Sequence, residues 1–196
     1  MSATPYPYEI GIVMGKSGCG KTSLVERLVT DAARRGWKVY AVDPNGAWEG
    51  VEGVRRVTAV DGDWESVLRA LEDPKIGPAI VIFDDADLYL RFAPRFALVW
   101  MTSHRHLRKH VILISRRPQG LSDILGNADW FALFAMREEN AREKWRRTLG
   151  DEVADMIPES NEKYVYCYVR DPDPPKLLQT TPRDSGLHKS EIGGDG

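Results

Sequence analysis

One stretch, Ile10-Gly-Ile-Val-Met14 followed by Gly15-Lys-Ser-Gly-Cys-Gly-Lys-Thr22, decides the fold of this 196-residue chain. Residues 10–14 are a short apolar run, and residues 15–22 match the pattern G-x-x-x-x-G-K-[ST]. A helical pattern over 21–35 follows at once. A strand, a glycine-rich loop and a helix in this order predict a phosphate-binding loop. In such a loop the backbone N–H groups and the helix N-terminus face the phosphates.

The residue types of the loop assign the contacts. Lys21 is expected to reach the β- and γ-phosphates of ATP, and the Thr22 hydroxyl is expected to bind Mg²⁺. Lys16 either adds a charge at the γ-phosphate or points to solvent. Cys19, near the helix N-terminus, has either a redox role or a space-filling one. The full set of expected nucleotide contacts is Gly15, Lys16, Ser17, Gly18, Cys19, Gly20, Lys21 and Thr22.

A second apolar run, residues 79–83, ends in the carboxylates Asp84 and Asp85. This is the Walker B pattern, in which Asp84 holds Mg²⁺ through its water shell. The second carboxylate, Asp85, can orient and deprotonate an attacking water. Hydrolysis requires such a group, whereas phosphoryl transfer to a substrate hydroxyl does not. Together the two motifs predict an ATP-hydrolysing site.

A third signal is the apolar run 111–114, followed by Ser115, Arg116 and Arg117. In P-loop ATPases with an extra strand between the two Walker strands, the tip of that strand carries a polar residue beside the γ-phosphate. Ser115 or Arg116 occupies this position here. Two arginines at a strand tip indicate a nearby anion or a subunit interface, although solvated side chains remain an alternative.

Short apolar runs alternate with helical patterns along the chain, which is typical of a parallel sheet with crossover helices. The runs are residues 10–14, 39–42, 79–83, 111–114 and 130–134, and the helical patterns are 21–35, 64–72, 94–109 and 138–149. We predict an α/β, three-layer P-loop domain of the RecA-like type. Its mainly parallel sheet has the core order 5-1-4-3-2, with the runs numbered along the chain. A sixth strand, residues 164–169, is expected at an edge.

Composition sets the domain organisation and the compartment. Residues 1–170 are expected to form one ATPase domain, and residues 171–196, rich in proline and glycine, a flexible C-terminal tail. No apolar run approaches the roughly 20 residues that span a membrane. Residues 1–9 do not read as a secretory signal, and two cysteines are too few for a disulfide framework. We therefore expect a cytoplasmic protein without an integral membrane segment.

The net charge of −2 hides an asymmetry, because residues 105–147 carry 10 Lys/Arg and 5 Asp/Glu, and residues 148–196 carry 5 and 10. The basic segment either serves an anionic partner or consists of solvated helix faces. Trp145 lies among Arg142, Lys144, Arg146 and Arg147. This tryptophan either belongs to a DNA-contacting surface or docks an amphipathic helix. A basic helix explains His104, His106 and His110 better than a metal site does.

From residue 79 to residue 169 the sequence resembles the FtsK/HerA superfamily of DNA-pumping ATPases. The resemblance rests on the acidic pair Asp84-Asp85, the arginine-bearing helix before residue 111, the following strand and the Arg116-Arg117-Pro118 turn. The Asp43-Pro44-Asn45-Gly46 turn after the second strand is also similar to an early turn of the family. With the phosphate-binding loop, the resemblance covers roughly residues 8–169. Without appended modules, the chain is most similar to the genome-packaging ATPases of tailless viruses with internal membranes.

The resemblance implies further roles and partners. Arg105, twelve positions before Arg117, matches the family arginine that reaches into the site of a neighbouring subunit. The alternatives for this role are Arg91, Arg95 and Arg108. The implied assembly is a homo-oligomeric ring that hydrolyses ATP and moves double-stranded DNA independently of sequence, through salt-sensitive backbone contacts. Packaging of a viral genome, with a capsid or portal component as partner, would take place in the host cytoplasm or the virion.

Two other functions stay open. A small-molecule or nucleotide kinase would need an acceptor pocket and an arginine lid, which residues 137–147 could supply. It would leave Asp85 and the Arg-Arg-Pro turn unexplained. An ATP-dependent switch or assembly factor would instead recruit partners through residues 171–196.

Overall fold

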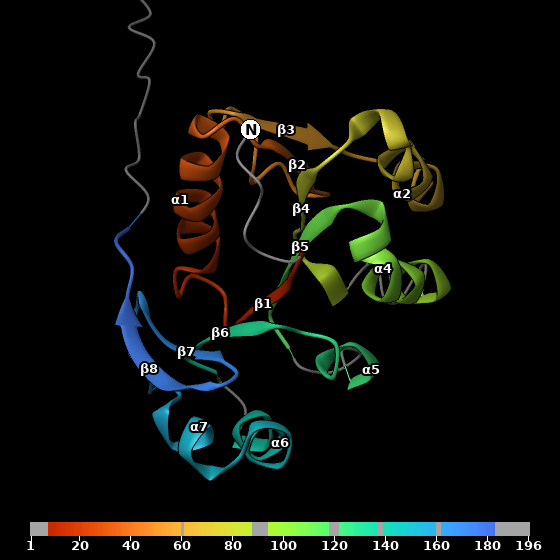
Figure 1. Cartoon of the computed structure of the whole chain (residues 1–196). Helices are drawn as coiled ribbons and strands as arrows, with labels where there is room; N and C mark the ends of the chain where they lie inside the picture. The colour runs from red at the N-terminus through yellow and green to blue at the C-terminus, as the bar shows by residue number, and fades with distance from the viewer. Residues whose placement is uncertain are drawn as a thin grey trace, which may run out of the picture.

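The computed structural model describes residues 8–59, 61–87, 94–117, 122–136, 139–159 and 162–182. They form an eight-stranded sheet flanked by helices (Figure 1). The strands are β1 (Ile10–Met14), β2 (Lys38–Val42), β3 (Val54–Val57), β4 (Ala79–Phe83), β5 (Lys109–Ser115), β6 (Trp130–Phe134), β7 (Val165–Arg170) and β8 (Asp173–Gln179). The helices are α1 (Lys21–Arg34), α2 (Trp64–Glu72), α4 (Pro94–Leu107), α5 (Ser122–Leu125), α6 (Glu139–Leu149) and α7 (Asp151–Met156), with a 3₁₀ turn at Pro74–Ile76.

The sheet order is β3-β2-β4-β5-β1-β6-β7-β8. The strands β3-β2-β4-β5-β1-β6 pair in parallel with one another. Strand β7 pairs antiparallel with β6, and β8 pairs antiparallel with β7. The predicted core order is confirmed, because the five predicted runs appear as β6-β1-β5-β4-β2. The α/β class is confirmed as well. The sheet is wider than predicted, since β3 extends one side and β8 the other.

Two expectations about the C-terminal region are wrong. The sixth predicted strand, β7, is not an edge strand, because β8 pairs with its outer side. Residues 173–179 are therefore part of the sheet and not of a tail that begins at residue 171. Pro174 and Pro175 obscured this strand in the sequence, since proline has no N–H for a sheet ladder and is tolerated only in outer strands. Residues 183–196 lie outside the described part.

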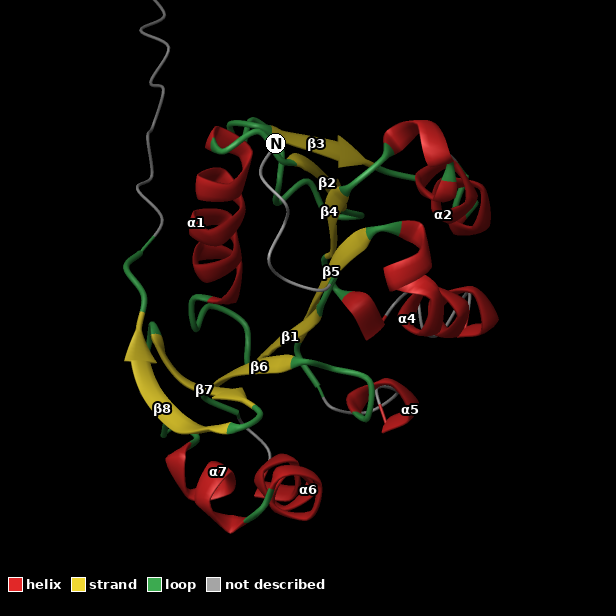
Figure 2. Cartoon of the chain, viewed as in Figure 1, coloured by secondary structure: helices red, strands yellow, loops and turns green. Residues whose placement is uncertain are grey.

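The strands separate two apolar layers, and helices cover both (Figure 2). Successive side chains of a strand point to opposite faces, so Ile12 joins one buried cluster and Val13 the other. Helix α1 covers the face of Val13. Helices α2, α4, α5, α6 and α7 contribute to the cluster that contains Ile12. Because β1, β4 and β5 are covered on both faces, their apolar residues form unbroken runs. Among the described helices, none is long and apolar enough to cross a membrane.

Helix α6 docks on the sheet through its aromatic residue. Trp145 is fully buried, and its ring meets that of Phe131 edge-on at 5.6 Å. Of the two alternatives for Trp145, a docked amphipathic helix is therefore correct, and a DNA-contacting tryptophan is wrong.

The basic residues of α6 are paired with acidic residues nearby. Arg146 lies 3.0 Å from both Asp151 and Asp155 of α7, and Arg142 lies 3.3 Å from Glu159. Arg147 pairs with Glu143 within the helix. The acidic segment 148–196 thus neutralises part of the basic segment 105–147. These arginines form neither a free anion-binding face nor the free arginine lid that a kinase would need, and Arg137 lies outside the described residues.

Candidate nucleotide site

The phosphate-binding loop is anchored at the carboxyl ends of two strands. The Gly15 N–H donates to the Ser115 carbonyl at 3.3 Å, and the Lys16 N–H donates to the Ala135 carbonyl at 2.9 Å. Gly20 has a φ of 108°, in the left-handed region that favours glycine. A Cβ on Gly20 would also lie 2.6 Å from the ring of Tyr164. The loop therefore needs glycine here for its conformation and for a close approach.

Helix α1 starts in a way that suits an anion. Its N-cap residue is Gly20, no side chain of the described chain caps the first turn, and that turn contains no acidic residue. The first N–H groups of a helix have no partner within the helix, and the helix dipole places partial positive charge there. This is the arrangement that binds phosphate groups. Thr22, the second residue of α1, is half-buried.

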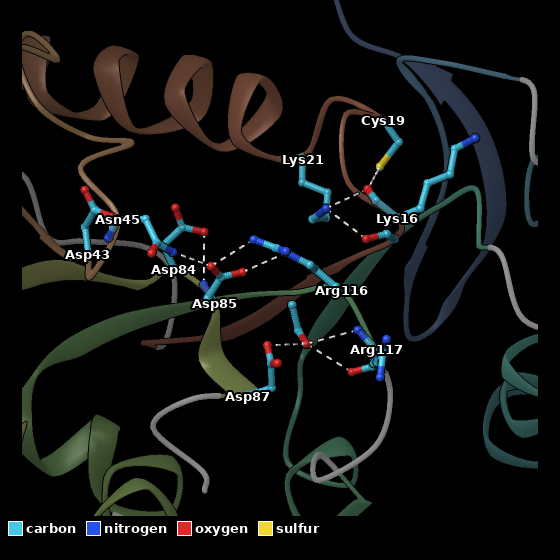
Figure 3. Close-up of polar contacts among 12 residues, drawn as sticks. Lys16, Cys19, Lys21, Asp43, Asn45, Asp84, Asp85, Asp87, Arg116 and Arg117 are labelled. Atoms are coloured by element: carbon cyan, nitrogen blue, oxygen red, sulfur yellow. Dashed lines mark hydrogen bonds and ion pairs between the residues drawn. The ribbon is translucent and has the colours of Figure 1, made fainter. Parts of the chain in front are cut away.

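Lys21 is buried at the base of the loop. Its Nζ donates to the carbonyl oxygens of Gly15 and Lys16, at 2.8 Å each (Figure 3). Burial lowers the pKa of Lys21, and the positive charge of Arg116 acts in the same direction. A phosphate would be a stronger partner for this ammonium than two neutral carbonyls. The geometry therefore suits an exchange of these carbonyls for a phosphate.

Asp84, at the end of β4, is buried. Its Oδ2 accepts from Trp48 Nε1 at 3.0 Å, and its Oδ1 accepts from the Asp85 N–H at 3.0 Å. Burial raises the pKa of this carboxyl, since the charged form loses hydration. A bound cation would oppose this shift, because it stabilises the ionised carboxylate. The Asp84 carboxylate and the Thr22 hydroxyl are the hard oxygen donors that Mg²⁺ prefers, so the residues of this edge fit the ion.

Asp85 is held by two side chains from other elements. Arg116 binds it with two nitrogens, Nε 3.1 Å from Oδ1 and Nη2 3.2 Å from Oδ2, and Asn45 Nδ2 donates to Oδ2 at 2.5 Å (Figure 3). The φ of Asp85 is 49°, an uncommon conformation for a residue other than glycine. The carboxylate is thus fixed in place while both of its oxygens are engaged.

The turn after β2 supplies donors to both acids. Asp43, fully buried, accepts from the N–H groups of Asn45 and Trp48 at 3.0 Å and from Arg56 Nε at 3.1 Å. This ordered turn brings Asn45 to Asp85 and Trp48 to Asp84. The Asp-Pro turn is visible in the sequence, but no local pattern there predicts a role for Asn45 or Trp48. A signal existed, because the predicted order places the strand before this turn beside the strand that ends in Asp84.

The two candidates for a γ-phosphate contact differ in their surroundings. The Ser115 hydroxyl is fully buried, donates to the Arg117 carbonyl at 3.0 Å and lies 3.3 Å from Asp87 Oδ1. Arg116, in contrast, is half exposed and lies on Asp85. Arg116 is therefore the better placed of the two to meet a phosphate.

Two loop residues left open by the sequence can now be described. Cys19 is fully buried, and burial raises the pKa of its thiol, which suits the space-filling alternative. The side chain of Lys16 points away from Asp84 and Asp85 (Figure 3). This direction fits the second alternative for Lys16, in which the charge does not lie at the γ-phosphate.

Arg105 lies at the amino ends of the strands, opposite the carboxyl ends that carry the phosphate-binding loop. It is 58% exposed and pairs with Asp129 at 3.1 Å, and Asp129 also accepts from the N–H of Ile10, the first residue of β1. Strand β1 separates this position from the phosphate-binding loop by roughly 17 Å at 3.3 Å per residue. Arg105 therefore cannot serve the site of its own chain, and its role in a neighbouring subunit stays a prediction. Among the alternatives, Arg91 lies outside the described residues, as does the side chain of Arg95.

The histidines near Arg105 hold the N-terminal segment. The ring nitrogens of His104 lie 2.9 and 3.1 Å from the carbonyl oxygens of Met101 and Tyr8. His110 Nδ1 accepts from the Glu9 N–H at 3.2 Å. Structural contacts thus account for both rings.

Comparison with solved structures shows which proteins share this fold. The genome-packaging NTPase B204 of Sulfolobus turreted icosahedral virus 2, solved with ATPγS, is 18% identical, with a TM-score of 0.74 over 89% of this chain and 98% of that chain. The conjugation coupling protein TcpA of pCW3, also with ATPγS, is 17% identical, with a TM-score of 0.66 over 88% and 60%. The cytoplasmic domain of the type VII secretion ATPase EccC of Thermomonospora curvata is 16% identical, with a TM-score of 0.64 over 87% and 25%.

No family model matches the chain, and no curated protein sequence matches it. The structural neighbours of like fold include a genome-packaging NTPase and a secretion ATPase. The resemblance found in the sequence is therefore confirmed as a likeness of fold.

Proposed function

We propose that this chain hydrolyses ATP with Mg²⁺ and, as a homo-oligomeric ring, uses the reaction to move double-stranded DNA into a viral capsid. The observation that carries the proposal is the acidic pair at the end of β4. Asp84 is buried, Asp85 is positioned by Arg116 and Asn45, and both carboxylates lie within electrostatic reach of Lys21. A nucleotide-binding loop alone would not require a second, positioned carboxylate.

The residues divide the chemistry between them. Lys21 and the N-terminus of α1 bind the phosphates, and Thr22 and Asp84 hold Mg²⁺. The ion would neutralise charge on the phosphate oxygens. Asp85 orients a water and accepts its proton as the water oxygen bonds to the γ-phosphorus. The bond from that phosphorus to the ADP oxygen breaks, and ADP and phosphate are the products.

Arg116 links nucleotide binding to the readiness of the base. Its guanidinium contacts both oxygens of Asp85 and so occupies positions at which the carboxylate would contact the attacking water. A γ-phosphate offers this half-exposed guanidinium another bidentate anionic partner. Transfer of Arg116 from Asp85 to the phosphate frees the base when ATP is present. A neighbouring subunit supplies Arg105, which would neutralise charge that develops on the γ-phosphate.

The DNA-directed part of the proposal is supported by the neighbours of like fold. B204 is a genome-packaging NTPase, and TcpA is a conjugation coupling protein. A motor that accepts any sequence grips the phosphate backbone, so binding should weaken steeply with salt. A capsid or portal component and a site of action in the host cytoplasm or the virion complete the proposal.

Steady-state ATP hydrolysis with and without long double-stranded DNA tests this function. DNA is expected to stimulate the wild type, and Asp85→Asn is expected to reduce hydrolysis to background while ATP still binds. Asp31→Asn is a matched control, because Asp31 is an exposed acid on α1 that pairs with Arg35. Hydrolysis indifferent to DNA would contradict translocation and favour the switch, and phosphoryl transfer to an added acceptor would favour the kinase.

A further inference from the structure

A nucleotide bound at Lys21 would have a defined direction along the carboxyl edge of the sheet. Asp84 and Asp85 mark the side of the γ-phosphate, and they follow β4, two strands from β1 in the order β4-β5-β1-β6-β7. A triphosphate held at the loop with its γ-phosphate on that side extends its nucleoside the other way. The base therefore lies toward β6 and β7.

Tyr164 is the aromatic residue at this position. It precedes β7, which is antiparallel to β6, so the start of β7 lies at the same edge as the phosphate-binding loop. The Tyr164 N–H donates to the Cys19 carbonyl at 2.8 Å. Its Cδ1 lies 2.6 Å from the point where a Cβ on Gly20 would be. The ring thus lies against the loop residue directly before Lys21.

The placement of Tyr164 is tightly held. Its carbonyl accepts from the N–H of Thr180, a buried residue, at 2.7 Å. Its φ is 62°, in the left-handed region that few residues other than glycine adopt. Such conformations persist where the surroundings enforce them, and they cluster at ligand sites. The ring is half-buried and is not part of either apolar cluster, so core packing does not explain it.

We propose that Tyr164 forms the nucleobase subsite, with its ring stacked on the purine base of the bound nucleotide. The inference rests on the proposed function, because it requires a nucleoside triphosphate at Lys21. Stacking on an aromatic ring is available to every base, since each has a π-face. The subsite therefore contributes affinity for the nucleoside and discriminates little between ATP and GTP.

Two ligands separate a base contact from support of the loop. The dissociation constants of ATP and of inorganic tripolyphosphate, which has no base, are measured with Mg²⁺ for the wild type, Tyr164→Ala and Tyr164→Phe. Tyr164→Ala should weaken ATP binding by about 5- to 100-fold and leave tripolyphosphate unchanged. Tyr164→Phe, which keeps the ring, should bind both as the wild type does. Tyr168→Ala is the control, because Tyr168 lies on β7, the strand that follows Tyr164, but contacts the ring of Trp130.

Three results would overturn the subsite. Equal weakening of ATP and tripolyphosphate in Tyr164→Ala would make the ring a support of the loop. Unchanged affinities in Tyr164→Ala would show that the ring contributes nothing. A wild type that binds neither ligand would reject the proposed function, and the subsite with it. Failure of the inference alone is thus distinct from failure of the function.

Discussion

Two buried lysines stand at opposite edges of the sheet. Lys21, at the carboxyl edge, donates to the carbonyls of Gly15 and Lys16, and Lys109, at the amino edge, donates to the carbonyl of Gly77 at 2.5 Å. Burial lowers the pKa of both side chains. Burial, carbonyl partners and a lowered pKa therefore do not by themselves make a lysine functional.

The surroundings distinguish the two lysines. Lys21 lies near Asp84 and Asp85 and is the first residue of α1, whose N-cap is Gly20. Among the charged groups that affect the pKa of Lys109, the cations Lys38 and Arg108 act more strongly than the carboxylate of Asp73. Only Lys21 combines a donor for phosphate with carboxylates suited to a metal ion and a water.

The largest difference is expected between alanine variants of the two lysines. Lys21→Ala should reduce ATP hydrolysis to background, because it removes the charge at the phosphates. Lys109→Ala should lower the melting temperature, since it leaves a buried cavity, but it should keep the affinity for ATP. Calorimetry measures the melting temperature and the affinity for ATP, and a steady-state assay measures the rate of ATP hydrolysis. Similar loss of ATP binding in the two variants would show that burial of the lysine, and not its setting, matters.

The next largest effect is expected at Arg105, which lies at the amino edge of the sheet and is proposed to act in the site of another subunit. Arg105→Ala should lower kcat of the assembled form on the order of 10³-fold, with little change in ATP affinity. Arg108 is the nearest alternative in the sequence for the role of Arg105. If Arg105 fills that role, Arg108→Ala should change kcat little. The measurement is steady-state hydrolysis at saturating ATP.

Mixing subunits decides between action in trans and action in cis. Arg105→Ala subunits keep an intact Asp85, and Asp85→Asn subunits keep Arg105. A mixture should regain hydrolysis wherever Arg105 of one subunit meets Asp85 of the other. A mixture no more active than its components would contradict the role in trans.

A smaller effect is expected at Asn45 on the carboxyl edge. Asn45→Ala removes one donor from Asp85 and should lower kcat about three- to tenfold while KM for ATP stays constant. Asn127→Ala, on a turn after α5, is the matched control. An unchanged or increased kcat would mean that Asn45 does not position Asp85 for catalysis.

The smallest effect compares two buried thiols. Burial raises the pKa of Cys167 from 9.0 to about 11 and raises that of Cys19 as well, although Lys21 and Lys16 oppose the shift at Cys19. At pH 8 the thiolate fraction of Cys167 is roughly a hundredfold below that of an ordinary cysteine. Iodoacetamide should therefore label Cys19 before Cys167, and ATP should slow only Cys19. Faster labelling of Cys167 would reverse the order.

The same shift gives the sign of a stability effect. Because the folded-state pKa of Cys167 is raised, its contribution to the free energy of unfolding is complete below pH 9 and is lost as the pH rises toward 11. Cys167→Ala should flatten the dependence of stability on pH in this window, as measured by urea unfolding.

Apolar periodicity predicted the buried elements well and the exposed ones poorly. The pattern over 64–72 coincides with α2, and five apolar runs became the parallel core. Strand β3 was missed because Arg55 and Arg56 interrupt its apolar pattern, and β8 because of its two prolines. Outer strands do not have to bury both faces, so hydrophobicity marks them weakly.

The candidate site divides in the same way. Lys21, Asp84 and Asp85 follow from local motifs, because each lies directly after a buried strand or its loop. Asn45 and Tyr164 do not, since Asn45 contacts a residue 40 positions away and Tyr164 approaches the loop from the last part of the chain. Such contacts depend on which strands become neighbours.

The sequence by itself determined the parallel core, the phosphate-binding loop and the acidic pair, because strand, loop and helix patterns are local and burial enforces them. Only the tertiary structure decided which side chains hold Asp85, that α7 neutralises part of the basic α6, and that Arg105 pairs with Asp129. These are contacts between segments far apart in the chain. Strand pairing and the crossing of the sheet from one edge to the other set them, and no local pattern encodes either.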